Sequence, residues 1–119
     1  MKKILVTILL LCVSTIFAQD TITANKASEN IGKEVWVKGT IASIKVASEG
    51  RSTNYINIDK PYPDSDFTVV ISNKYVEEHQ LNLAEAKNKK IRVKGVISVY
   101  EKDPKKTPQI FNPSQIIIE

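Results

Sequence analysis

The sequence predicts an all-β domain in which five strands close into a small barrel, with a short helical insert between the third and fourth strands. One pattern, Lys-x-(Val/Ile)-x-Val-Lys-Gly-x-Ile, occurs at residues 33–41 and returns at residues 89–97. Both copies alternate apolar and polar residues, which is typical of a strand with one buried face. Each copy has a glycine in mid-strand, Gly39 or Gly95, where a missing side chain permits a bulge, a sharp bend or a close backbone approach. Two long, bent strands in so small a chain predict a closed or nearly closed barrel.

Residues 1–18 have the pattern of a secretory signal peptide. A basic start precedes an apolar run at residues 4–17, and Ala18 is followed by polar residues. The run is shorter than the roughly 20 residues of a comfortable bilayer span, and the alternative is a retained N-terminal anchor. Cys12 follows a leucine inside the run, which argues against lipid attachment. We therefore expect a single domain at residues 19–119, periplasmic or secreted, with no membrane span after signal cleavage.

The charge of this domain is only mildly basic. Removing Lys2 and Lys3 from the 17 basic residues leaves 15, against 13 acidic residues, which is a net charge of +2. A dedicated DNA-binding domain usually carries a much stronger excess. Because Cys12 is the only cysteine, the mature domain has no disulfide framework and no thiolate metal site.

The first strand is expected at residues 34–46, after a polar segment in which a short helix precedes the barrel. Val35, Val37 and Ile41 point to one side, but Ile44 has the opposite parity. A strand that changes its inward parity needs a bulge, which we expect at Gly39 or at the Ala42–Ser43 pair.

The remaining strands are expected at residues 54–59, 66–72, 89–101 and 110–118, the last of them broken near Pro113. A proline-containing turn at residues 60–65 and a loop rich in lysine and proline at residues 102–109 separate strands, because proline cannot donate to a ladder. At residues 74–88 the apolar period changes and helix formers dominate, which predicts one or two short helices.

This layout, and a few short motifs within it, resemble a known fold. The motifs are Tyr55-Ile56-Asn57-Ile58-x-Lys60-Pro61-Tyr62-Pro63, Phe67-Thr68-Val69-Val70-Ile71, Val93-Lys94-Gly95-Val96-Ile97 and Pro108-Gln109-Ile110. Over residues 21–119 the chain resembles the OB fold, a five-stranded Greek-key barrel. It looks like the small bacterial OB domains grouped with anticodon-binding-like nucleic-acid-binding modules, which often accompany exported nucleases and nucleotidases. It is also similar to the periplasmic bacterial OB-fold family, which is thought to bind small or cationic ligands.

The resemblance implies that ligands bind on the outer face of the second and third strands, between the loops that follow the first and fourth strands. Aromatic planes stack bases and cations neutralise phosphates, so we expect the ligand to be single-stranded nucleic acid or a nucleotide. The alternatives are a small ligand, a cell-wall glycan or a protein, an accessory role beside an exported nuclease, or a face that lysines merely keep soluble. The candidate binding residues are Trp36, Lys38, Arg51, Tyr55, Asn57, Thr68, Arg92, Lys94, Lys105 and Lys106.

No motif in the sequence indicates catalysis or a metal. Asp59, Asp64 and Asp66 flank one turn, but a calcium loop of the EF-hand type needs a longer ligand set with a central glycine. His79 is the only histidine and has no cysteine or second histidine to complete a zinc site. We therefore expect a monomeric binding module, not an enzyme, with no cofactor and no metal.

Overall fold

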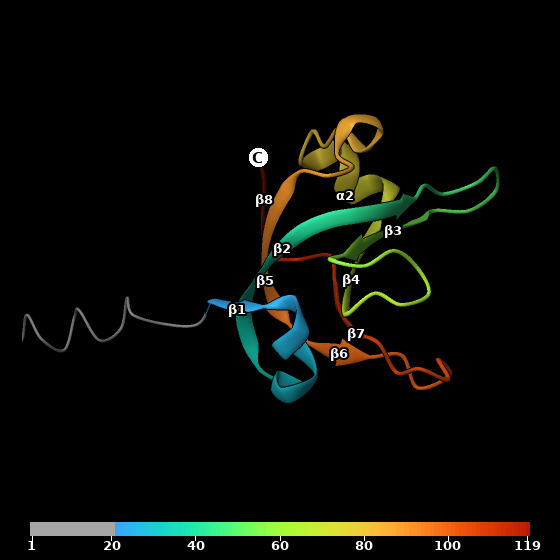
Figure 1. Cartoon of the computed structure of the whole chain (residues 1–119). Coiled ribbons are helices and arrows are strands. Elements are labelled where there is room, and N and C mark those ends of the chain that lie inside the picture. The colour runs from blue at the N-terminus through green and yellow to red at the C-terminus, as the bar shows by residue number, and fades with distance from the viewer. Residues whose placement is uncertain (1–20) are drawn as a thin grey trace, which may run out of the picture.

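The computed structural model describes residues 21–119, and the predicted signal peptide at residues 1–18 lies outside this range. Figure 1 shows the arrangement of the strands and helices. The strands are β1 (Thr21–Thr23), β2 (Glu34–Lys45), β3 (Thr53–Ile58), β4 (Phe67–Ser72), β5 (Lys90–Val96), β6 (Ser98–Val99), β7 (Pro108–Phe111) and β8 (Gln115–Ile118). The helices are the 3₁₀ helices η1 (Ala24–Asn30) and η2 (Leu83–Glu85), and the α-helix α2 (Asn73–Glu78).

The strands form one curled sheet whose two edges are joined through the chain. Its hydrogen-bonded order is β6-β7-β4-β3-β2-β5-β8, with β1 added in parallel to β2. The strands at the two ends of this order are continuations of inner strands, because β6 follows β5 across Ile97 and β8 follows β7 across residues 112–114. The expected fold class is confirmed: the five predicted strands correspond to β2, β3, β4, β5–β6 and β7–β8, with short helices between β4 and β5.

The first long strand contains the expected bulge. In the β2–β3 ladder Ile41 pairs with Ile58, but the next pair joins Ser43 to Asn57, so Ala42 is the extra residue. The bulge explains why Ile41 and Ile44 both approach the core although their parities differ. Gly39 serves a different purpose, since a Cβ built on it would collide with the Ile58 side chain.

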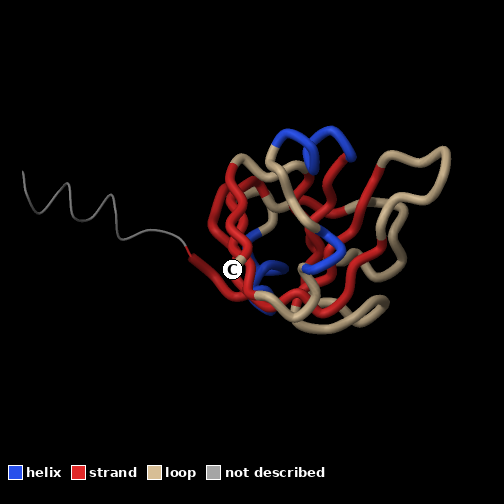
Figure 2. Tube along the Cα trace, turned by 90° about the horizontal axis from the view of Figure 1, so that it is seen from above, coloured by secondary structure: helices blue, strands red, loops and turns tan. Residues whose placement is uncertain are grey.

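The barrel interior is filled by apolar side chains. Figure 2 shows the strands curling round a common axis. The largest of the core side chains along this axis, all at most 2% exposed, are Val37, Ile41, Ile56, Ile58, Phe67, Val69, Ile71, Ile91, Val93, Ile97 and Ile110. Burial of this apolar surface is the main favourable term for folding. Because the interior is occupied, any ligand must bind on the outer surface.

Two local features were not predicted. The strand β1 pairs Thr21 with Trp36 and Thr23 with Lys38, but three residues are too few to show a strand period. The predicted fourth strand is interrupted at Ile97, whose backbone N–H donates to Lys33 O (3.1 Å) outside the ladders.

The helix α2 fastens the break in the last strand. Its N-cap residue Ser72 accepts a hydrogen bond from the Tyr75 backbone N–H (3.1 Å). The buried Tyr75 side chain then donates from its hydroxyl to Pro113 O (2.6 Å), between β7 and β8. Over the described range 21–119, no helix is long and apolar enough to cross a membrane.

Candidate functional site

Three loops project to the same side of the molecule, and two of them border a pocket. They are residues 46–52 after β2, 59–66 after β3 and 100–107 after β6, on the right in Figure 1. Between the 59–66 and 100–107 loops and the outer face of β3 and β4 lies a cavity of about 540 Å³, here called the tyrosine pocket. It lies where the resemblance placed the ligand. Its lining residues are Ser43, Ile44, Lys45, Tyr55, Asn57, Tyr62, Ser65, Thr68, Tyr100, Asp103, Thr107 and Gln109.

The floor of the tyrosine pocket is a hydrogen-bonded polar network centred on Asn57. The Asn57 Nδ2 donates to Ser43 Oγ (3.1 Å), and its Oδ1 accepts from Thr68 Oγ1 (3.2 Å) and Ser65 Oγ (3.4 Å). Ser43 Oγ also accepts from the Tyr62 backbone N–H (3.4 Å), so the floor holds the 59–66 loop in place. Buried polar groups need such partners, which makes this network a fixed support for whatever enters the pocket.

Little of the Asn57 and Thr68 side chains reaches solvent, although strand alternation correctly placed both on the outer face. Asn57 is 4% exposed and Thr68 is 9% exposed. Both do point out of the barrel, but the loop at residues 59–66 folds over them. Strand alternation distinguishes the two faces of a strand, and it does not show which loop covers the outer one.

The walls of the pocket carry three aromatic rings from three separate segments. Tyr55 comes from β3, Tyr62 from the 59–66 loop and Tyr100 from the 100–107 loop, and they are 39%, 79% and 55% exposed. A tyrosine ring offers a flat apolar face and a hydroxyl that can donate or accept a hydrogen bond. The three exposed rings can therefore stack on a planar or ring-shaped ligand.

The charges around the tyrosine pocket are balanced. Lys45 and Asp103 are the charged residues that line it. In the surrounding loops three lysines face acids: Lys60 lies 3.8 Å from Asp66, Lys105 lies 3.5 Å from Asp64 and Lys106 lies 4.0 Å from Glu101. Exposed ion pairs of this kind contribute little stability, but they cancel the field that an anionic ligand would feel.

The predicted site residues Lys105 and Lys106 lie at the rim and do not line the pocket. The Lys105 Nζ donates to Pro63 O (3.2 Å) in addition to its ion pair with Asp64. It thereby links the 100–107 loop to the 59–66 loop. Lys106 pairs with Glu101 inside its own loop.

Arg51 lines a second cavity of about 450 Å³, which shares Lys45 and Tyr55 with the tyrosine pocket. Asn54, which is 1% exposed, holds the base of this loop. Its Oδ1 accepts from the Ala47 backbone N–H (2.8 Å) and its Nδ2 donates to Asn73 Oδ1 (2.9 Å). Arg51, Lys45 and Tyr55 therefore line one cavity, and Lys45 and Tyr55 also line the tyrosine pocket.

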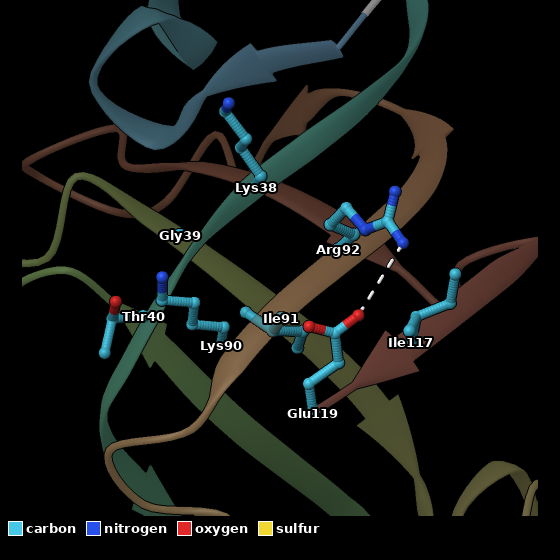
Figure 3. A pocket seen from close by; sticks show the side chains of 8 residues that line it. All are labelled: Lys38, Gly39, Thr40, Lys90, Ile91, Arg92, Ile117 and Glu119. Atoms are coloured by element: carbon cyan, nitrogen blue, oxygen red, sulfur yellow. Dashed lines mark ion pairs between the residues drawn. The ribbon is translucent and has the colours of Figure 1, made fainter.

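The other predicted site residues lie on a different part of the sheet. All four point outward from β2 and β5, namely Trp36, Lys38, Arg92 and Lys94. They lie away from the tyrosine pocket because the first half of β2 pairs with β5 and only its second half pairs with β3. Figure 3 shows Lys38 and Arg92 around a hollow of about 200 Å³, where Arg92 Nη2 lies 3.8 Å from Glu119 Oε1. The structure therefore divides the predicted site into two surfaces.

Several residues of the tyrosine pocket were not predicted from the sequence. Tyr62 could have been selected, since it is an aromatic residue in the predicted proline-containing turn at residues 60–65, whereas Tyr100 fell inside the strand predicted at residues 89–101. Ser43, Ser65 and Gln109 carried no comparable signal.

Groups that were considered for metal binding have other partners. The Asp59 Oδ1 accepts from the Thr40 backbone N–H (2.9 Å), while Asp64 and Asp66 face the lysines described above. His79 stacks on Tyr75 with ring centroids 3.8 Å apart, and burial raises the pKa of Tyr75 to about 12. Within residues 21–119, no group of three or more His, Cys, Asp or Glu side chains is placed to hold a metal ion.

The sequence matches no protein-family model and no curated protein. Solved structures with a similar fold include an OBody bound to hen egg-white lysozyme (19% identity, 84% of this chain, 94% of that chain, TM-score 0.60). Others are a putative aspartyl-tRNA synthetase from Leishmania major (10% identity, 85% of this chain, TM-score 0.59) and asparaginyl-tRNA synthetase from Pyrococcus horikoshii (14%, 82%, 0.58). This chain spans only 21% and 22% of the length of the two synthetases. At these identities the likeness shows the fold alone, and the chain has the OB fold that its strand pattern resembled.

Proposed function

We propose that this chain is an exported binding module that holds single-stranded nucleic acid, or a nucleotide, in the tyrosine pocket. The observation that carries the proposal is the placement of three exposed tyrosine rings around a polar floor. Stacking of one base on an aromatic ring contributes roughly 1–3 kcal/mol. The amide of Gln109, which lines the pocket, can hydrogen-bond to the edge of a stacked base.

The adjoining cavity supplies the charge that a phosphate needs. Arg51 and Lys45 lie beside Tyr55, so a base stacked on that ring would bring its phosphate toward these two cations. Two of the solved structures with a similar fold are tRNA synthetases, and the tRNA in their names is a nucleic acid. The two cations and the likeness to tRNA synthetases both favour nucleic acid as the ligand.

The balanced charge of the pocket favours a second candidate, a neutral glycan or other small polar ligand of the cell envelope. Sugar rings also present a flat apolar face to an aromatic ring, and they need hydroxyl and amide partners rather than cations. Lys45 and Asp103 are the charged lining residues, which suits an uncharged ligand.

A titration followed by the NMR signals of Tyr55, Tyr62 and Tyr100 tests both candidates. An oligothymidylate should shift these signals, and its affinity should fall with added salt, with a slope of about −0.7 for each phosphate contact. If a muropeptide shifts them and the oligothymidylate does not, the glycan replaces the nucleic acid. If neither probe moves the three rings, the pocket is not the binding site. Trp36 fluorescence does not report on this pocket, because Trp36 lies on another face.

Export and the absence of catalysis also belong to this proposal. The signal-peptide pattern of residues 1–18 supports export. The mass of the protein recovered outside the cytoplasm should correspond to a chain that begins at Gln19, and an uncleaved chain would contradict this. No turnover of an oligonucleotide is expected in the titrated samples, and a shortened product would contradict the binding role.

A further inference from the structure

A second surface of the molecule carries an ordered array of cations. The outward residues of β1, β2, β5 and β8 stand in two rows across the sheet, here called the basic face. One row is Thr21, Trp36, Lys94 and Gln115, and the next is Thr23, Lys38, Arg92 and Ile117. Lys90 follows on β5 opposite Thr40. The acids on the same side are Glu34, at the start of β2, and Glu119, whose backbone N–H donates to Lys90 O (2.9 Å).

Most cations of the basic face have no acidic partner among residues 21–119. Lys38 and Arg92 are direct cross-strand partners, and like charges in such a pair repel each other. Arg92 has Glu119 as a partner at 3.8 Å, as Figure 3 shows. Within residues 21–119, Lys38, Lys90 and Lys94 make no ion pair. Repulsion between these cations does not stabilise the fold, so binding of an anionic ligand is the explanation that we consider for the array.

The geometry of the array fits a linear polyanion. Lys90, Arg92 and Lys94 are alternate residues of one strand, so their side chains stand about 7 Å apart in a line. A single small anion could contact only one or two of them. A phosphodiester chain carries one charge for each nucleotide and can follow the whole line. Trp36, half-buried beside Lys94, adds an aromatic ring to the same surface.

We propose that the basic face binds the phosphate backbone of single-stranded nucleic acid, as a second contact surface separate from the tyrosine pocket. This inference rests on the proposed nucleic-acid function and extends it, because backbone contacts at the basic face require no particular base. An anionic membrane fits less well. Ile117, which is 37% exposed, is the exposed apolar residue within the two rows, and a membrane-surface face usually presents several.

The test compares two purified variants that lose the same charge. Lys38→Gln/Arg92→Gln removes the cross-strand pair, and Lys74→Gln/Lys87→Gln removes two exposed lysines outside the basic face, one on α2 and one in the loop before β5. The probes are an oligothymidylate, an abasic oligonucleotide of the same length and vesicles that contain phosphatidylglycerol. The first variant should bind both oligonucleotides at least tenfold more weakly at low salt. Its salt slope should flatten by about 1.4, which is two phosphate contacts. Its unfolding midpoint should not fall, because a repulsive pair has been removed.

Each other outcome overturns the proposal. An unchanged affinity of Lys38→Gln/Arg92→Gln for the abasic probe would show that the basic face does not contact phosphates. An equal loss in Lys74→Gln/Lys87→Gln would show a general charge effect. Loss of vesicle binding alone would assign the face to lipid. If the tyrosine pocket is not the base-binding site, the result is different. Substitutions of Tyr62 and Tyr100 would then leave the preference for the oligothymidylate over the abasic probe unchanged.

Discussion

Gly95 lies against Ile110, so that a Cβ built on Gly95 would stand 2.6 Å from the Ile110 Cγ2 atom. The first copy of the repeated pattern has the same feature, since a Cβ on Gly39 would collide with Ile58. Both glycines therefore allow a neighbouring isoleucine to enter the core beneath the strand.

Gly95→Ala should lower the free energy of unfolding by about 1–3 kcal/mol, which is the usual cost of overpacking. Urea unfolding followed by circular dichroism measures the change. The double variant Gly95→Ala/Ile110→Ala is the control, because removal of Cγ2 also removes the collision. The double variant should lose less stability than the two single variants together, and simple additivity would contradict the contact.

Tyr75 should make stability depend on alkaline pH. Burial raises its pKa from 10.0 to about 12. A phenol whose pKa is higher in the folded state stabilises the fold fully below pH 10, and this contribution is lost as the pH rises from about 10 to 12. Tyr75→Phe should lose about 1 kcal/mol below pH 10, because the hydrogen bond to Pro113 O is gone. It should also show a shallower decline above pH 10 when unfolding is measured across this range. An identical decline in the variant and the parent protein would contradict the assignment.

Tyr62→Ala and Tyr100→Ala should each weaken binding of an oligothymidylate roughly 5- to 150-fold, which corresponds to the stacking contribution of one ring. The stability of each variant should change by less than about 0.5 kcal/mol, because both side chains are exposed. Isothermal titration and thermal unfolding measure the two quantities. Phe111→Ala is the matched control, since Phe111 is 57% exposed and does not line the tyrosine pocket. Equal losses in all three variants would argue against a specific pocket.

Lys105→Met should separate two of the loops around the pocket without unfolding the domain. It removes the Lys105 contacts with Pro63 O and Asp64, and its ion pair is exposed, so the loss of stability should stay below about 1 kcal/mol. Amide hydrogen exchange at residues 59–66 should become faster. Lys106→Met, which breaks a pair within one loop, should leave exchange at residues 59–66 unchanged. The same rate in both variants would show that Lys105 does not hold the loops together.

Much of this fold could be predicted because the alternating apolar and polar residues at residues 33–41 and 89–97 indicate two strands and the face that each strand buries. The bulge near Ala42 followed from the opposed parities of Ile41 and Ile44, and the broken last strand followed from Pro113. The strand β1 and the interruption at Ile97 could not be predicted, because each depends on a partner far away in the chain rather than on a local period.

The candidate site was predicted less completely for a related reason. Alternation placed Trp36 and Lys38 outward, as the structure does, but it could not show that this part of β2 lies beside β5 and away from Tyr55. Loop positions were the other gap. The fold of residues 59–66 over Asn57 and the approach of Tyr62 and Tyr100 depend on tertiary packing that no spacing rule describes.

The segment that joins the two edges of the sheet, residues 108–118, follows every other strand in the chain. A ribosome therefore delivers it after the strands that it must bridge. Until then β4 and β5 each have an unpaired edge, and the apolar interior has no complete wall. The order of synthesis therefore leaves the sheet incomplete until residues 108–118 have left the ribosome.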